Sequence, residues 1–282
     1  MRTIAITNQK GGCGKTTTAV NLAAAFAEKN YRTLLVDLDQ QGHSTIGLGY
    51  DPDKLNMTIY NALVKDQIEI PEVTMNTKIE LLDLAPSNVL LSGAEVDLKD
   101  IVVLSEKLKM VGEKYDITII DCPPSLGMLT LNGLLASTGV VVPVQVHYYA
   151  MEGLKQLFET VNVIAERFSP SKVRILGVLL TLVENNTLLS RQIQQQMREF
   201  FGDLVFDAVI HKSVRLAEAP SAGEPALLYA PGSKGSVEYR ALAEEIINGW
   251  TLVEQIQTLA EELSDDGTSI EQTSSDYALV RR

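Results

Sequence analysis

The stretch from Gln9 to Thr18, with the sequence QKGGCGKTTT, constrains the fold of this chain more than any other. It follows a β-branched apolar run at residues 2–7 and leads into an alanine-rich run, 19–29, that predicts a helix. Glycines let backbone N–H groups converge on an anion, and the start of a helix supplies further unpaired donors. Strand, glycine loop and helix in this order therefore predict a nucleotide-binding P-loop.

Within the loop, the P-loop pattern gives roles to particular side chains. Lys15 is expected to reach the β- and γ-phosphates, and the Thr16 hydroxyl is expected to ligate Mg²⁺. An ordinary glycine turn before a helix would need neither the lysine nor the hydroxyl. The predicted phosphate-binding residues are Gly11, Gly12, Cys13, Gly14, Lys15, Thr16 and Thr17.

Three carboxylates at predicted strand ends are the next candidates for chemistry. Asp121 ends the apolar run 117–121 and is expected to hold Mg²⁺ opposite Thr16, although a strand-end aspartate can also be a simple helix cap. Asp37 and Asp39 lie two positions apart, so an extended backbone places both on one side. Such a pair beside a triphosphate requires positive charge from Mg²⁺ and lysines.

The order of elements predicts an α/β fold with a doubly wound, mostly parallel sheet, because apolar strands alternate with helical stretches. Helix 92–113 is expected to start at Ser92, another helix at Ser125, and Pro143 indicates a bulge or an unpaired strand position. Strands are expected at 2–7, 32–37, 79–84, 117–121, 140–146, 173–182 and 204–210, and helices at 57–64, 92–113, 150–168, 188–201 and 234–263.

Length and composition suit one domain with an extension. We expect the 282 residues to divide into a P-loop domain (1–249), a helical extension (250–263) after an interruption near Gly249 and Trp250, and an acidic, disordered tail (264–282). No apolar run approaches the roughly 20 residues needed to span a bilayer, and the first strand leaves no room for a signal peptide. We therefore expect a cytoplasmic protein.

The cysteines, histidines and net charge bear on disulfide bonds, metal sites and nucleic-acid binding. Cys13 and Cys122 are expected to be small buried residues in a reducing compartment, and His43, His147 and His211 are too scattered for a metal site. The net charge of −12 argues against strong, indiscriminate nucleic-acid binding but leaves room for a local basic patch.

The run KGGCGKTT resembles the deviant P-loop of the ParA/MinD class of ATPases, in which Gln9 replaces the usual glycine and Lys10 is an extra lysine. The resemblance implies an ATP-dependent dimer in which Lys10 reaches the partner's nucleotide. It also implies that Asp39, in VDLDQQ, orients the attacking water, although Gln40 and His43 depart from the family's usual proline and asparagine. The alternative for Asp39 is an Asx turn that caps its loop.

Segments 121–127, 143–154 and 214–221 resemble a chromosomal Soj-type ParA, and the likeness covers roughly residues 2–248. The chain starts at the first strand, so we expect no operator-binding helix-turn-helix domain before it. The family implies non-specific DNA binding on the nucleoid by the ATP dimer and an adaptor, ParB-like or attached to cargo, that stimulates hydrolysis. Arg215 matches a DNA-binding arginine, Asn186 replaces another, and Arg191, Arg198 and Lys212 are candidates to compensate.

Three alternatives remain at this point. A membrane-associated, MinD-like ATPase would need a basic amphipathic C-terminal helix, whereas this one carries Glu238, Glu244, Glu245, Glu254, Glu261 and Glu262. An electron-transfer ATPase would need exposed cysteines for a cluster. A small-metabolite phosphotransferase would need a second substrate pocket, which no motif indicates.

Overall fold

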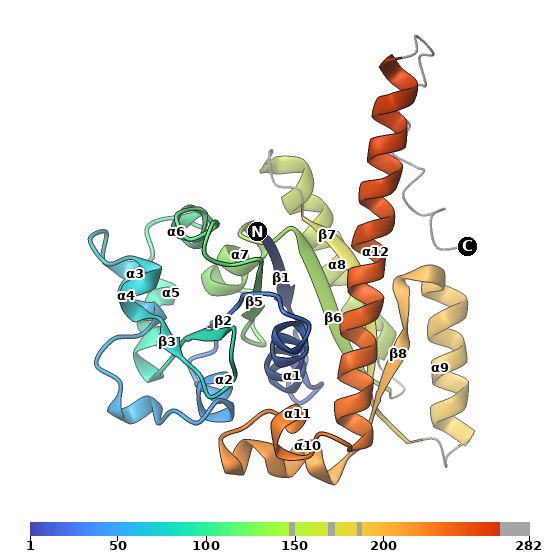
Figure 1. Cartoon of the computed structure of the whole chain (residues 1–282), viewed down its shortest axis with the longest axis horizontal. Helices are drawn as coiled ribbons and strands as arrows, with labels where there is room; N and C mark the ends of the chain where they lie inside the picture. The colour runs from blue at the N-terminus through green and yellow to red at the C-terminus, as the bar shows by residue number, and fades with distance from the viewer. Residues whose placement is uncertain (147–149, 169–172, 185–187, 266–282) are drawn as a thin grey trace.

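The computed structural model describes residues 1–146, 150–168, 173–184 and 188–265, and their strands form one sheet (Figure 1). The strand order is β3-β4-β2-β5-β1-β6-β7-β8, and all pairings are parallel except that of β3 with β4. The strands are β1 (Arg2–Ile6), β2 (Thr33–Asp37), β3 (Met75–Asn76), β4 (Leu82–Ala85), β5 (Ile117–Asp121), β6 (Gly139–Gln145), β7 (Arg174–Val183) and β8 (Val205–His211).

Helices cover both faces of this sheet, as the alternation of elements predicts. One apolar core forms with α1 and α12, and the other with α3, α6, α7, α8 and α9. The helices are α1 (Lys15–Glu28), α2 (His43–Gly47), α3 (Ile59–Val64), α4 (Ile70–Val73), α5 (Ala94–Asp97), α6 (Val103–Lys109), α7 (Met128–Leu135), α8 (Ala150–Arg167), α9 (Leu188–Phe201), α10 (Val214–Glu218), α11 (Ala226–Tyr229) and α12 (Lys234–Asp265), with 3-10 turns η1 (Pro52–Lys54), η2 (Val89–Gly93), η3 (Gly202–Leu204) and η4 (Ala219–Ala222).

The central strands β2 and β5 are buried along their whole length, because helices pack on both faces of a parallel sheet. This explains why their sequences are mostly apolar before the final aspartate. The doubly wound α/β class is confirmed. Most expected strands and the helix at 188–201 occur within one or two residues of their predicted bounds.

The expected strand at 79–84 is wrong at its start. Leu81 has a φ of 65°, and the Leu82 amide donates to the Ile79 carbonyl, so residues 79–82 form a turn. β4 therefore begins only at Leu82 and pairs with β2.

The single helix expected at 92–113 is also wrong, because the chain forms η2, α5 and α6 there. The side chain of Asn132, on α7, accepts from the Leu104 amide at 3.0 Å and donates to the Asp100 carbonyl at 3.2 Å. These bonds join an amide in the first turn of α6 and a carbonyl of the segment before it to α7, and they take the place of continuous helical bonding.

The helix expected from Ser125 begins instead at Met128, after Gly127. The Glu95 carboxylate accepts a hydrogen bond from the Met128 amide at 2.8 Å. The first amide of α7 is therefore capped by a residue 33 positions earlier in the sequence. Pro143 lies inside β6 beyond the last residue paired with β1, and its carbonyl accepts from the Asn8 side chain. On its other side Pro143 pairs with Leu179 of β7, so it is unpaired only toward β1, and the register irregularity between β6 and β7 falls earlier, between Val140 and Val141.

The interruption expected near Gly249 and Trp250 is wrong, because α12 is continuous from Lys234 to Asp265. Trp250 stacks on Phe26 of α1 with ring centroids 5.7 Å apart, and this packing holds the helix through Gly249. The expected boundary at residue 249 thus falls inside a helix whose later part projects past the sheet (Figure 1). Of the expected acidic tail, residues 266–282 lie outside the described residues.

Candidate functional site

The P-loop lies where β1 ends and α1 begins, at the carboxyl edge of the sheet. Gly14 precedes α1 with a φ of 91°, a left-handed conformation that favours glycine. A Cβ at Gly14 would lie 3.7 Å from the Thr181 methyl group, and the Thr181 hydroxyl donates to the Cys13 carbonyl at 2.7 Å. Strand β7 therefore holds the loop through the side chain of Thr181.

The two lysines of the loop lie differently. The buried Lys15 ammonium donates to the Lys10 carbonyl at 3.0 Å, so its charge is held over the loop. The Lys10 side chain is exposed, and its backbone amide donates to the Asn8 side chain at 3.0 Å. Asn8 in turn donates to the Pro143 carbonyl at 2.7 Å, so β6 braces the backbone that carries Lys10.

Asp37 and Asp121 lie side by side, because β2 and β5 pair in register at these residues. Both are fully buried, yet their oxygens have different partners. Asp37 accepts from the Thr45 amide at 2.9 Å, from the Thr45 hydroxyl at 2.8 Å and from the Asp39 amide at 3.2 Å. Asp121 accepts from the Ser44 hydroxyl at 2.8 Å through Oδ2, while its buried Oδ1 has no partner.

Burial raises the pKa of both carboxyls well above the ordinary range of aspartate. For Asp121 the neighbouring charge of Asp37 adds to this shift, whereas the hydroxyls of Ser44 and Thr16 oppose it. Two buried carboxylates with an unpaired oxygen favour a cation at this place, and the Thr16 hydroxyl lies near the Asp121 carboxylate. The donor set fits Mg²⁺, which prefers carboxylate and hydroxyl oxygens.

Asp39 begins the loop that follows β2. Its Oδ1 accepts from the Gln41 amide at 3.0 Å, and its carbonyl accepts from the Ser87 hydroxyl at 2.8 Å. The first bond is the Asx turn considered from sequence. It fixes the carboxylate on its own loop, beside Asp37, and is compatible with a role toward water.

Cys13 and Cys122 are free and buried, as predicted. Burial raises the pKa of both thiols, so neither is a reactive thiolate. Within the described residues, no group of three or more histidine, cysteine or acidic side chains could hold a metal ion. A magnesium site at Asp121 and Thr16 needs fewer protein ligands than such a cage.

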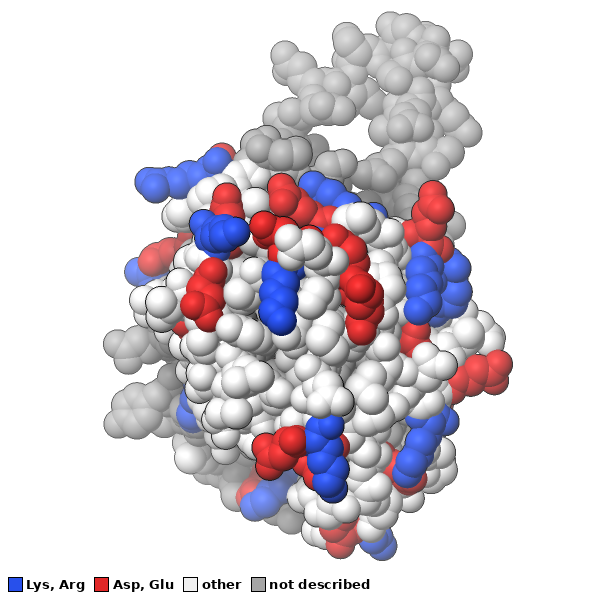
Figure 2. Space-filling view, turned by 90° about the vertical axis from the view of Figure 1, so that its left-hand side faces the viewer, with Lys and Arg blue, Asp and Glu red and all other residues white. Residues whose placement is uncertain are grey.

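The four predicted DNA-contacting residues come from α9, α10 and the end of β8. Arg215 pairs with Glu218 at 2.8 Å, Lys212 with Glu184 at 2.7 Å, and Arg198 lies 3.6 Å from Asp207. Arg191 is exposed on α9, and Asn186 lies outside the described residues. Three of these cations thus have an acidic neighbour, and acidic and basic side chains are also interspersed on the face shown in Figure 2.

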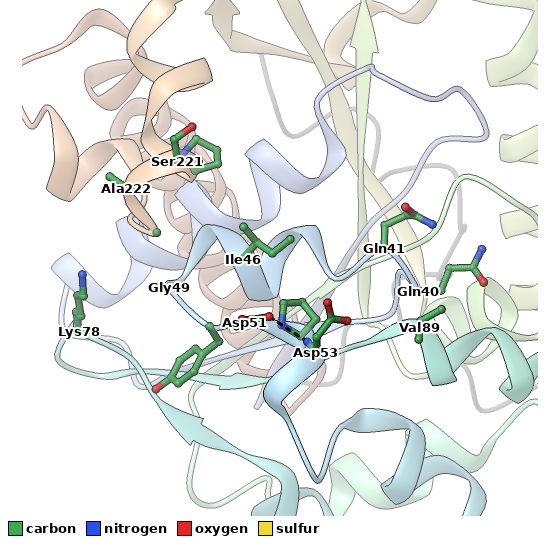
Figure 3. Close-up of a pocket in the computed structure, with 14 residues that line it drawn as sticks. Gln40, Gln41, Ile46, Gly49, Asp51, Asp53, Lys78, Val89, Ser221 and Ala222 are labelled. Atoms are coloured by element: carbon green, nitrogen blue, oxygen red, sulfur yellow. Dashed lines mark hydrogen bonds between the residues drawn. The ribbon is translucent and has the colours of Figure 1, made fainter.

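A hollow of about 660 Å³ lies beside the loop that follows Asp39 (Figure 3). Gln40 and Gln41 line it on one side, and Ser221 and Ala222 of η4 on another. No residue from Gly11 to Thr17 lines it, so it is separate from the P-loop. It connects the surface next to Asp39 with the segment that follows α10.

Sequence reasoning missed Ser44, Thr45, Thr181 and Asn8. Ser44 and Thr45 follow the VDLDQQ run after Gly42 and His43, and two adjacent hydroxyls so close to that run were a readable signal. Thr181 and Asn8 act through bonds to residues 168 and 135 positions away. No local pattern marks such partners.

Comparison with known proteins gives the family. Residues 1–175 match the model of a family described as an AAA domain. The chain is 45% identical to the sporulation initiation inhibitor protein Soj of Bacillus subtilis, over 86% of this chain and 97% of that protein. The chain belongs to the ParA/Soj-type partition ATPases.

Further relatives agree with this family. The chromosome partitioning protein ParA of Myxococcus xanthus is 43% identical, over 87% of this chain and 88% of that protein. A crystal structure described as cobyrinic acid a,c-diamide synthase from Mycobacterium smegmatis, with bound ADP and magnesium, superposes with a TM-score of 0.77. It is 34% identical and covers 89% of this chain and 96% of that one. None of the described helices of this ParA/Soj-type chain is both long and apolar enough to cross a bilayer.

Proposed function

We propose that this ParA/Soj-type ATPase closes into a homodimer on ATP and Mg²⁺, binds DNA without sequence preference and positions a cargo with the help of an adaptor. The adaptor, ParB-like or attached to the cargo, stimulates hydrolysis and releases the ATPase from DNA. Its place in the cell is then the cytoplasm, on the nucleoid. The observation that carries this proposal is the loop with two lysines beside a buried, half-partnered Asp121.

ATP fits the loop and magnesium fits the carboxylate beside it. Lys15 would exchange the Lys10 carbonyl for the β- and γ-phosphates, a stronger, charge-assisted partner. Thr16 and Asp121 would hold Mg²⁺, which when bound neutralises charge on the phosphates. The relative from Mycobacterium smegmatis, which carries ADP and magnesium, supports these cofactors.

The second lysine supports the dimer. Lys10 presents its side chain to solvent while Asn8 fixes its backbone, so the ammonium is placed at the edge of the loop instead of inside it. A cation at that position can meet phosphates of a second copy across an interface. Asp39, held by the Gln41 amide, would then orient a water molecule for attack.

The surface charge supports weak and reversible attachment to DNA. Arg215, Lys212 and Arg198 each have a carboxylate neighbour, so a phosphate must compete with that acid. Exposed ion pairs contribute only about 0–1 kcal/mol, so this competition is possible at low salt. Dimerisation doubles the number of phosphate interactions, and the binding should weaken steeply as salt increases.

The proposal is tested with the purified wild-type protein. Light scattering after size exclusion should give a monomer with ADP and a dimer with a non-hydrolysed ATP analogue and Mg²⁺. In the dimer state, two unrelated DNA duplexes should bind with equal affinity at low salt. A monomer under both conditions contradicts the dimer, and a dimer that ignores both duplexes contradicts the DNA role.

A further inference from the structure

We propose that Ser44 is a positioning residue for the metal site, since its hydroxyl orients Asp121 so that the unpartnered Oδ1 faces the cation. This inference rests on the proposed Mg-ATP site and assigns a role in it to a residue outside the P-loop. Ser44 belongs to α2, which no P-loop pattern includes.

The hydrogen bond between Ser44 and Asp121 has an ordinary length and is shielded from water. The Ser44 hydroxyl donates to Asp121 Oδ2 at 2.8 Å, and both residues are fully buried. A buried carboxylate with one oxygen held and the other unpartnered has a fixed orientation about its last bond. The bond to Ser44 therefore leaves Oδ1 as the acceptor that remains for a metal ion.

Ser44 is placed by its neighbours and not by this bond alone. Thr45 bonds Asp37 through both its amide and its hydroxyl, and the Thr45 hydroxyl also accepts from the Ser87 amide at 2.9 Å. Gly42 precedes α2 with a φ of 63°, and a Cβ there would lie 3.2 Å from the Ser87 carbonyl oxygen. α2 should therefore stay in place when the Ser44 hydroxyl is removed.

Ser44 differs from other buried serines in the group that accepts its hydrogen bond. Ser87 and Ser137 donate to backbone carbonyls, of Asp39 and Gly133, which is the usual way to satisfy a buried hydroxyl. Ser44 instead donates to the carboxylate that meets the metal. Groups that hydrogen-bond a metal ligand typically change metal affinity by about 10–100-fold.

The test measures ADP affinity by calorimetry in Mg²⁺ and in EDTA, for wild type, Ser44→Ala and the matched control Ser137→Ala. The ratio of the dissociation constant in EDTA to that in Mg²⁺ measures how much the metal ion strengthens ADP binding. Ser44→Ala should lower this ratio about tenfold and leave the EDTA affinity within about twofold, while Ser137→Ala keeps the wild-type ratio. In a second experiment, Mn²⁺ is titrated with ADP present, and the paramagnetic signal of free Mn²⁺ is followed. It should show directly that Ser44→Ala binds the metal ion more weakly than wild type.

A double-variant cycle tests whether Ser44 acts through Asp121. In an Asp121→Asn background, Ser44→Ala should change the ratio no further. A wild-type ratio in Ser44→Ala, an equal loss of affinity in EDTA, or an unfolded variant by circular dichroism would each contradict the positioning role. If the wild-type protein binds ADP equally well with and without Mg²⁺, the metal site is contradicted, and with it the proposed function.

Discussion

Asp37 and Asp121 occupy paired positions on neighbouring parallel strands, yet three protein donors bond Asp37 whereas one oxygen of Asp121 has none. The same residue type at the same strand end thus serves two purposes. Asp37 orders the loop that contains Asp39 and α2, and Asp121 is left for a cation.

Replacing Asp121 should raise the stability of the protein while it removes the effect of Mg²⁺ on nucleotide binding. Asp121→Asn removes a buried charge next to Asp37, so we expect the nucleotide-free protein to melt higher in EDTA at neutral pH. Each kcal/mol gained should raise Tm by about 2–4 °C. The same variant should lose the effect of Mg²⁺ on ADP affinity. Thermal unfolding with calorimetry checks both, and a lower Tm without metal would contradict the account.

Lys15→Ala should abolish ATP binding, because it removes the buried charge that is to meet the β- and γ-phosphates. Calorimetry with ATP and Mg²⁺ is the direct measurement. The Cys13 carbonyl keeps its bond to Thr181 in this variant, so the loop should remain folded. Unchanged ATP affinity would overturn the P-loop assignment.

Lys10→Ala should leave nucleotide binding by the monomer nearly intact while it removes ATP-dependent dimerisation or hydrolysis. The substitution keeps the backbone amide and carbonyl that bond Asn8 and Lys15, so only the exposed ammonium is removed. Light scattering and a phosphate-release assay check this result. A variant that dimerises and turns over ATP like wild type would mean that Lys10 is a solvated surface charge.

Asp39→Ala should yield an ATP-bound dimer that does not hydrolyse its nucleotide and stays on DNA. Lys15, Thr16 and Asp121 remain to hold Mg-ATP, while the group proposed to orient water is absent. Size exclusion with ATP, followed by analysis of the bound nucleotide, tests this. If only monomer appears, Asp39 is either structural, through its bond to the Gln41 amide, or a primary metal ligand.

Arg215→Glu should abolish ATP-dependent DNA binding with little change in ATP turnover in the absence of the adaptor. Removing one interaction with a DNA phosphate should lower the log–log salt slope by about 0.9 per site. Glu218→Gln is the matched control, because it frees Arg215 from its ion pair and should strengthen binding at a given salt. Asn186→Arg should also strengthen it. Unchanged binding by Arg215→Glu would move the interface to Arg191, Arg198 and Lys212.

The sequence predicts best those parts of the molecule whose causes are local. The P-loop and the apolar strand that ends at Asp121 are continuous patterns, so spacing alone identifies them. The break between α5 and α6 depends on Asn132, whose bonds reach back 28 and 32 positions. Propensity favours a continuous helix there, and a tertiary hydrogen bond overrides it.

The same division holds within the candidate site. Lys15 and Asp121 belong to motifs, but the hydroxyl that orients Asp121 comes from 77 positions away. The adjacent hydroxyls of Ser44 and Thr45 can be noticed in the sequence, but no local pattern shows which carboxylate each of them bonds. Its significance appears only when β2 and β5 pair in register and bring α2 to the end of β5.

The bond between Thr18 and Tyr239 spans 221 positions and joins the nucleotide-loop helix to α12 at 3.1 Å. During synthesis, α1 emerges early, but the part of α12 that packs beside it is made 221 positions later. Apolar residues on that side of α1, such as Phe26, must therefore wait for Trp250. Pairings of such separation slow folding, and exposed apolar surface invites aggregation in the interval. The ribosome-bound chain should thus become competent for nucleotide only after α12 has been made.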